Sequence, residues 1–188
     1  DNINKNVQYK ELKEYVWNKD ICRETFEKTF PNIQEPLLIR GLCKNIEAVK
    51  QWSANNIVDF FDDTLLTVET YGSFDSYYNG LVVDKLTTSS LTMREYIDII
   101  KDNNEPPFYY LAEFNLDKIR NPYVDNNNNK YSLKDFFLNN KEFNMSNEEL
   151  ENTIYIGKNT TSNCHVHIEH NFLLNQIFGT KTIYLFDY

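Results

Sequence analysis

Residues 154–188 read IYIGKNTTSNCHVHIEHNFLLNQIFGTKTIYLFDY, and this stretch decides the fold of the chain. It contains all three histidines of the protein, which are His165, His167 and His170. A β-like run at 153–156 precedes the histidines and is ended by Gly157. After a turn predicted at Gly179-Thr180, residues 181–186 alternate again as a strand does. The stretch therefore predicts β-structure around the histidines.

The two histidines that stand two residues apart, His165 and His167, are the candidate metal ligands. On a strand, residues i and i+2 point to the same face, so both imidazoles can reach one ion. On a regular strand His170 would point to the opposite face, and we interpret it as a surface or outer-sphere residue. A metal held between strands is typical of a β-barrel or sandwich rather than a helix bundle. The alternative is a chance cluster without a metal.

Several positions in this stretch, taken in order and spacing, resemble the JmjC, or cupin-like, branch of the Fe(II)- and 2-oxoglutarate-dependent oxygenases. That family has a strand ending in Gly, a Ser/Thr-x-x-His-x-Asp/Glu motif, an Asn, an apolar run with Gln, and Gly-x-Lys before a strand ending in Leu-Phe. The matching residues are Ile156-Gly157, Ser162, His165, His167, Asn171, Gln176, Gly179, Lys181 and Leu185-Phe186. The resemblance implies an α+β fold, a double-stranded β-helix (the jelly-roll or cupin barrel) with flanking N-terminal helices.

The resemblance also implies a metal centre. His165 matches the first ligand to Fe(II), and His167 stands where the family has a carboxylate, which leaves the site one charge more positive. Glu169 is the nearest carboxylate, but on a regular strand it lies too far along to replace His167. The family's third ligand is a histidine on a later strand, and no histidine follows His170. We therefore expect residues 1–188 to form a single JmjC-like cupin domain that is partial, lacking the C-terminal part of the barrel and leaving open apolar edges.

Four residues match positions that contact the cosubstrate 2-oxoglutarate. Lys181 is implied to pair with its distal carboxylate, because a buried ammonium needs an anion. Lys181 shares a predicted strand face with apolar residues, which favours an inward position; the alternative is a solvated Lys at a strand edge. Tyr110 is implied to touch a carboxylate with its hydroxyl, the alternative being an ordinary strand tyrosine. Ser162 and Asn171 match positions that contact the cosubstrate or orient the metal ligands.

Composition sets limits on the whole chain. Its 188 residues suit one domain, and 41% hydrophobic residues can bury a core. A net charge of −9 disfavours a broad grip on nucleic-acid phosphates, and DNA in particular. Three cysteines without paired spacing favour a reducing compartment, so we expect an intracellular location, cytoplasmic or nuclear. No stretch approaches the ~20 apolar residues of a membrane span, and the N-terminus does not resemble a signal peptide.

The rest of the chain predicts short helices and strands in alternation. Apolar spacing predicts helices at 9–17, 48–52, 55–61 and 133–138. It also predicts a helix that begins within 91–96 and ends before the segment 103–107. Their predicted N-caps are Ser53, Thr92 (with Glu95 three residues on) and Ser132. Strands are predicted at 35–42, 64–71 and 108–113, and loops at 73–80, 121–130 and 142–151.

Three functions follow as expectations. The resemblance implies an oxygenase that consumes O2, decarboxylates 2-oxoglutarate to succinate and hydroxylates a substrate C–H bond. It is nearest to the small hydroxylase-like members that act on a protein side chain or a tRNA base, and a histone lysine demethylase is an alternative. The second is a JmjC-like fold that binds a metal or a partner without turnover, which His167 supports. The third is a metal cupin whose chemistry does not use 2-oxoglutarate.

Overall fold

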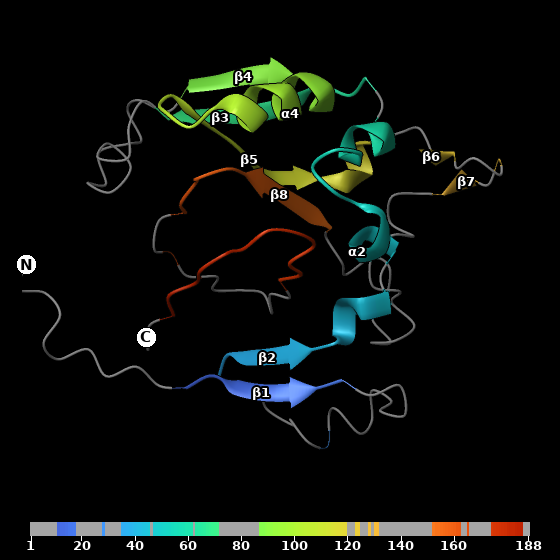
Figure 1. Ribbon diagram of the computed structural model, residues 1–188, viewed down its shortest axis with the longest axis vertical. Coiled ribbons are helices and arrows are strands. Elements are labelled where there is room, and N and C mark those ends of the chain that lie inside the picture. The colour runs from blue at the N-terminus through green and yellow to red at the C-terminus, as the bar shows by residue number, and fades with distance from the viewer. Residues whose placement is uncertain are drawn as a thin grey trace, which may run out of the picture.

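The centre of the structure is a four-stranded antiparallel sheet with the strand order β4-β3-β5-β8 (Figure 1). Its strands are β3 (Leu66–Tyr71), β4 (Thr87–Leu91), β5 (Phe108–Asn115) and β8 (Thr153–Gly157). The strands predicted near β3, β5 and β8 are confirmed, whereas β4 was not predicted. The computed structural model describes residues 11–17, 28, 35–45, 47–61, 63–71, 87–119, 123–124, 128, 130–131, 152–162, 165 and 174–185.

Helix α4 (Met93–Asp102) packs on one face of this sheet. It begins where the sequence predicted, because Thr92 and Glu95 form a reciprocal capping box: the Thr92 hydroxyl accepts from the Glu95 amide, and the Glu95 carboxylate accepts from the Thr92 amide. Tyr96 and Ile97 on its apolar side are buried against Leu111 and other sheet residues. Asn103 ends the helix, as predicted.

Two shorter helical elements complete the core. These are α2 (Glu47–Gln51) and the 3-10 helix η2 (Ile57–Phe60), with Trp52 between them. The Trp52 ring lies 5.8 Å from Phe60 and 6.3 Å from Phe61, centroid to centroid, so three aromatic rings fill one end of the core. The prediction of Ser53 as an N-cap was wrong. Ser53 instead donates its backbone N–H and its hydroxyl to the Asn56 side chain, at 2.8 Å and 2.9 Å.

The two faces of β5 and β8 carry different side chains. Leu111, Ile154 and Ile156 belong to the core cluster beneath α4. Tyr110 is only 6% exposed yet lies outside that cluster, as expected for a neighbour of Leu111 that points to the other face. Residues 174–185, drawn in red, lie on the side of β8 away from α4 (Figure 1). This second face holds the candidate site.

A separate two-stranded sheet contradicts one predicted helix. Residues 9–17 were predicted to be helical, but β1 (Lys13–Val16) is a strand that pairs in parallel with β2 (Leu37–Arg40). The Arg40 guanidinium donates to both carboxylate oxygens of Glu14, at 2.7 Å and 2.6 Å, and the Trp17 amide donates to the Arg40 carbonyl at 2.8 Å. Pairing with a strand distant in sequence therefore overrode the local helical spacing. The strand predicted at 35–42 is confirmed in its centre, and it ends at Gly41, whose φ is +83°.

A closed jelly-roll barrel is not formed by the residues that the structure describes. Their sheet is open, with β4 and β8 at its edges. The strand predicted at 181–186 was wrong over 181–185, where the backbone is irregular. None of the described strands pairs with this segment, so its backbone groups join no ladder within the described part of the chain. Its apolar side chains Ile183, Tyr184 and Leu185 are 51%, 70% and 58% exposed.

The remaining elements are short. They are the 3-10 helices η1 (Leu42–Asn45) and η4 (Leu116–Lys118) and the antiparallel strands β6 (Tyr123–Val124) and β7 (Lys130–Tyr131). The region 121–130, predicted as a loop, therefore contributes to a small hairpin. The predicted loop at 73–80 and the predicted helix at 133–138 lie outside the described residues. Within the described part of the chain, none of the helices has the length and apolar character needed to cross a bilayer.

Candidate cosubstrate site

The site begins where Tyr110 on β5 lies opposite Gly157 on β8. A Cβ atom placed on Gly157 would come within 2.9 Å of Cδ2 of the Tyr110 ring and of Cγ2 of Thr160, and closer still to the Thr160 hydroxyl. Real Cβ atoms do not approach other atoms so closely. Gly157 is therefore needed here for its missing side chain, which lets the tyrosine ring lie across the neighbouring strand.

The Tyr110 hydroxyl lies 3.4 Å from the Ser162 hydroxyl, so the structure brings two of the predicted cosubstrate residues together. Burial raises the pKa of Tyr110, the bond to Ser162 opposes this shift, and the negative charges of Glu69 and Glu113 add to it. Tyr110 therefore stays a neutral phenol at physiological pH. A neutral phenol keeps the proton that it would donate to a carboxylate.

Lys181 reaches the same face through Tyr155. Its ammonium lies 5.4 Å from the centroid of the Tyr155 ring, a cation–π contact, and that ring lies 6.5 Å from the Tyr110 ring. The expectation that Lys181 points into a closed barrel beside Ile183 and Leu185 is not met, because all three side chains are exposed. Lys181 and Tyr110 nevertheless both lie near the Tyr155 ring, and Ser162 lies at the Tyr110 hydroxyl.

The backbone bends at residues 178–179, just before Lys181. The Gln176 side-chain amide donates to the Phe178 carbonyl at 2.8 Å, and Gly179 has a φ of +76°. This left-handed conformation costs glycine little, and it confirms the predicted turn. The spacing Gln176, Gly179, Lys181 that carried the family resemblance thus spans this bend, with Lys181 following it.

Two residues of this face were missed in the sequence. Tyr155 was interpreted only as part of a strand, although alternation with Ile154 and Ile156 places it on the face of Gly157. Glu113 sits at an irregularity of β5, between Leu111 and Phe114, where the register shifts and where its own φ is +51°. Burial raises the pKa of Tyr155, and the Glu113 carboxylate adds to this shift. Bulges re-aim side chains in this way, but sequence periodicity does not reveal them.

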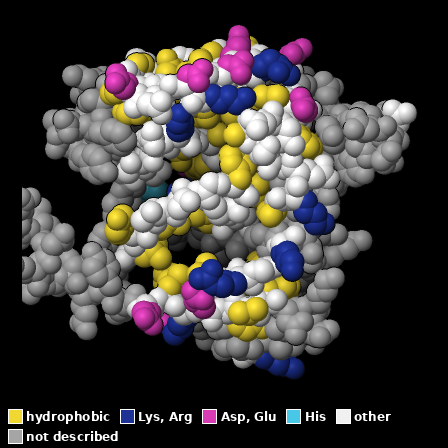
Figure 2. Space-filling view, in the orientation of Figure 1, with side chains coloured by type: hydrophobic (Ala, Val, Ile, Leu, Met, Phe, Trp, Pro, Cys, Tyr) yellow, Lys and Arg dark blue, Asp and Glu magenta, His cyan; other side chains and the backbone are white. Residues whose placement is uncertain are grey.

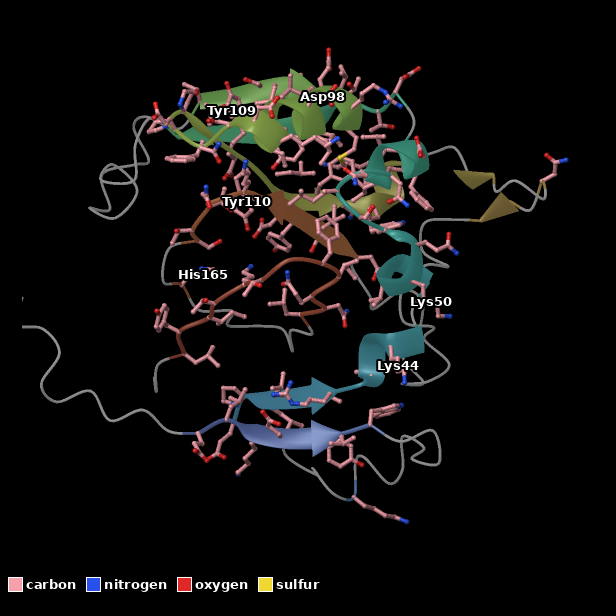
Figure 3. All side chains as sticks on the ribbon, viewed as in Figure 1. Lys44, Lys50, Asp98, Tyr109, Tyr110 and His165 are labelled. Carbon is pink, nitrogen blue, oxygen red and sulfur yellow. The ribbon has the colours of Figure 1, made fainter. Side chains whose placement is uncertain are left out.

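Of the two expected metal ligands, His165 and His167, the structure describes only His165. His165 is exposed and lies on irregular backbone three residues after Ser162, rather than on the expected strand. Figure 3 shows it on the chain that follows β8, on the same side of the sheet as the site face. His167, His170, Glu169 and Asn171 lie outside the described residues. Among the residues that are described, no three His, Cys, Asp or Glu side chains cluster, so His165 is the single expected metal ligand that the structure places.

Figure 2 shows the molecule hollowed in its middle, with hydrophobic side chains on the walls of the hollow and charged ones mainly on its upper and lower rims. The histidine appears at the edge of the hollow. A concave apolar surface with a few polar groups is the usual form of a small-molecule site.

Comparison with known families places the chain in a class. A family model described as a cupin-like domain matches residues 23–188. The match includes β2, the whole four-stranded sheet and the site face, and the chain therefore belongs to the cupin-like domain family. No match was found among curated proteins.

Proposed function

We propose that the chain is an Fe(II)- and 2-oxoglutarate-dependent oxygenase of the JmjC-like branch that hydroxylates a protein side chain or an RNA base. The observation that carries the proposal is a series of contacts. The Lys181 ammonium lies over the Tyr155 ring, that ring lies 6.5 Å from the Tyr110 ring, and the Tyr110 hydroxyl lies 3.4 Å from the Ser162 hydroxyl. When bound, Fe(II) and 2-oxoglutarate supply the oxidation of a substrate C–H bond by O2.

The site face offers donors to a dicarboxylate, and Lys181 has to offset the negative charges of Glu69 and Glu113 that act on Tyr110. The Lys181 ammonium offers a positive charge and hydrogen-bond donors, while the Tyr110 and Ser162 hydroxyls offer neutral donors. An exposed cation–π contact contributes only about 0.5–1 kcal/mol, so Lys181 exchanges it readily for a carboxylate. Hydrogen bonds to charged groups contribute about 1.5–3 kcal/mol, and the exchange is therefore favourable once the ligand is bound.

The candidate metal ligand lies close to one of these donors in the sequence. His165 follows Ser162 by three residues, so a metal held by His165 would lie close to a cosubstrate held by Ser162 and Tyr110. This closeness is what chelation of a metal by 2-oxoglutarate requires. His167 would be the second ligand and would replace a carboxylate with a neutral imidazole. That replacement favours one second candidate function, a cupin-like binding module without turnover.

Substitution of Lys181 tests the proposal. Lys181→Ala should weaken 2-oxoglutarate binding by at least about tenfold, because it removes one charge-assisted hydrogen bond. The measurement is calorimetric titration of 2-oxoglutarate into the chain with Mn(II) in place of Fe(II).

Lys118→Ala is the matched control. The Lys118 ammonium lies 5.8 Å from the centroid of the Phe114 ring. This is also a cation–π contact, but it involves neither Lys181 nor Tyr155. Lys118→Ala should bind 2-oxoglutarate like the unmodified chain. Equal 2-oxoglutarate affinities of the unmodified chain and both variants would show that Lys181 does not bind 2-oxoglutarate. Absence of 2-oxoglutarate binding by all three proteins would favour a cupin of other chemistry.

A further inference from the structure

The Tyr96 hydroxyl connects helix α4 to both strands of the site. It accepts a hydrogen bond from the Leu111 amide at 3.2 Å and donates a short hydrogen bond to the Ile156 carbonyl. It also lies 3.4 Å from the Tyr109 carbonyl oxygen. Tyr96 is fully buried, with 0% of its surface exposed, so water does not compete for these contacts.

The two backbone groups that Tyr96 joins are register partners. Leu111 on β5 lies opposite Ile156 on β8, and the register shift of the pair begins immediately after Leu111. A bulge interrupts the regular ladder between two strands. The hydroxyl therefore supplies a connection between β5 and β8 at the point where their own pairing becomes irregular.

Each of these backbone groups is one residue away from the site. Leu111 follows Tyr110, and Ile156 lies between Tyr155 and Gly157. The Tyr110 ring lies against Gly157 with no room for a Cβ atom, so a small change in the spacing of the strands would move the ring. The spacing also sets the distance between the rings of Tyr110 and Tyr155.

We propose that Tyr96 is a positioning residue: its buried hydroxyl fixes the spacing of β5 and β8 and thereby places Tyr110 and Tyr155 for ligand binding. The part that concerns 2-oxoglutarate rests on the proposed function, whereas the part that concerns strand spacing does not. Burial also raises the pKa of Tyr96, so the hydroxyl keeps its proton throughout the physiological range.

The test compares Tyr96→Phe with Ile97→Val in the whole chain. Both residues lie on the buried side of α4, but only the first change removes a hydroxyl. The thermal stability of both variants is measured first. Tyr96→Phe should accelerate hydrogen exchange at the Leu111 amide about tenfold more than Ile97→Val does, because only the Tyr96 change removes the hydroxyl that accepts from that amide. It should also raise the Kd for 2-oxoglutarate several-fold, by the same titration as above.

The outcomes separate the two proposals. Uniformly faster exchange across the sheet in Tyr96→Phe, without selectivity for Leu111, would show that Tyr96 is only a core residue. Selective exchange at Leu111, with no 2-oxoglutarate binding even in the unmodified chain, would keep the positioning role and refute the proposed ligand. If Tyr96→Phe does not fold, NMR of the unmodified chain decides: a slowly exchanging Tyr96 hydroxyl proton close to the Leu111 amide supports the proposal. Its absence, with neighbouring amides protected, refutes it.

Discussion

At the scale of single residues, the candidate site depends on the absence of a side chain at Gly157. Gly157 faces Tyr110 with no space for a Cβ atom, and its φ is not in the region that favours glycine. Gly179 is the reverse case, with a φ of +76° and open space around it. One glycine is required by contact and the other by backbone conformation.

Gly157→Ala therefore tests the packing of the site. The new methyl group should displace Tyr110 or Thr160, lower stability by about 1–3 kcal/mol, as overpacking does, and weaken 2-oxoglutarate binding. Gly179→Ala should cost about 1 kcal/mol through backbone strain alone. Chemical denaturation gives both energies. A Gly157→Ala protein with unchanged stability and affinity would show that Tyr110 does not need this contact.

Sequence patterns predicted part of the candidate site at this scale. Tyr110, Ser162 and Lys181 were predicted because they belong to a recognisable spacing, and the structure places the hydroxyls of Tyr110 and Ser162 close together. Tyr155 and Tyr96 were missed because an aromatic residue on a strand or helix is usually a core residue, and only its partners distinguish it. The Tyr96 hydroxyl contacts Ile156, which is 60 residues away in the chain, and single-sequence patterns do not encode such a contact.

At the scale of helices and strands, α4 carries its signal within its own sequence, whereas β1 depends on a distant partner. Helix α4 was predicted because its cap, Thr92 with Glu95, lies within the element itself. β1 was predicted to be helical because its partner β2 lies more than twenty residues away, and the bond between Arg40 and Glu14 is invisible to local spacing. The strand at 181–186 was predicted from alternation, yet a strand needs a neighbour, and none of the described strands provides one.

The capping box of α4 gives a pH dependence. Hydrogen bonds from the Thr92 amide and hydroxyl hold the pKa of Glu95 below its usual value of 4.5. Because the folded pKa lies below the unfolded one, the carboxylate stabilises the fold above pH 4.5, and this contribution is lost as the pH falls.

Glu95→Gln should therefore lower the Tm at neutral pH, and the difference from the unmodified chain should shrink as the pH falls from about 5 to about 3. Thermal unfolding followed by circular dichroism at several pH values measures this difference. A Tm difference that does not change over this range would mean that the charge of Glu95 does not stabilise the helix.

The whole molecule combines a negative net charge with a proposed anion site. The chain carries a net charge of −9, so a dicarboxylate approaches against the overall field and depends on local cations such as Lys181. The open sheet exposes β4 and β8 as edges within the described part of the chain. The cupin-like family was predictable from one stretch of sequence, whereas the open arrangement of the described strands follows from long-range pairing.

If the chain is the proposed oxygenase, the identity of residue 167 should control its turnover. His167→Asp would restore the carboxylate of the family motif and reduce the positive charge of the metal site by one. We expect tighter Fe(II) binding and more succinate formed from 2-oxoglutarate, while the matched control His170→Asp should show neither gain. Loss of metal from His167→Asp, with no gain in succinate, would show instead that an all-histidine metal site is native to this chain.

The central claim is that one face of the sheet holds 2-oxoglutarate beside a metal. Its most direct test is anaerobic visible absorption of the chain, with Fe(II) and 2-oxoglutarate added in turn. The proposed site predicts a metal-to-ligand charge-transfer band that appears only when both are present and that weakens in Lys181→Ala at limiting 2-oxoglutarate. Bound metal without such a band would contradict the claim and indicate a cupin that does not use 2-oxoglutarate.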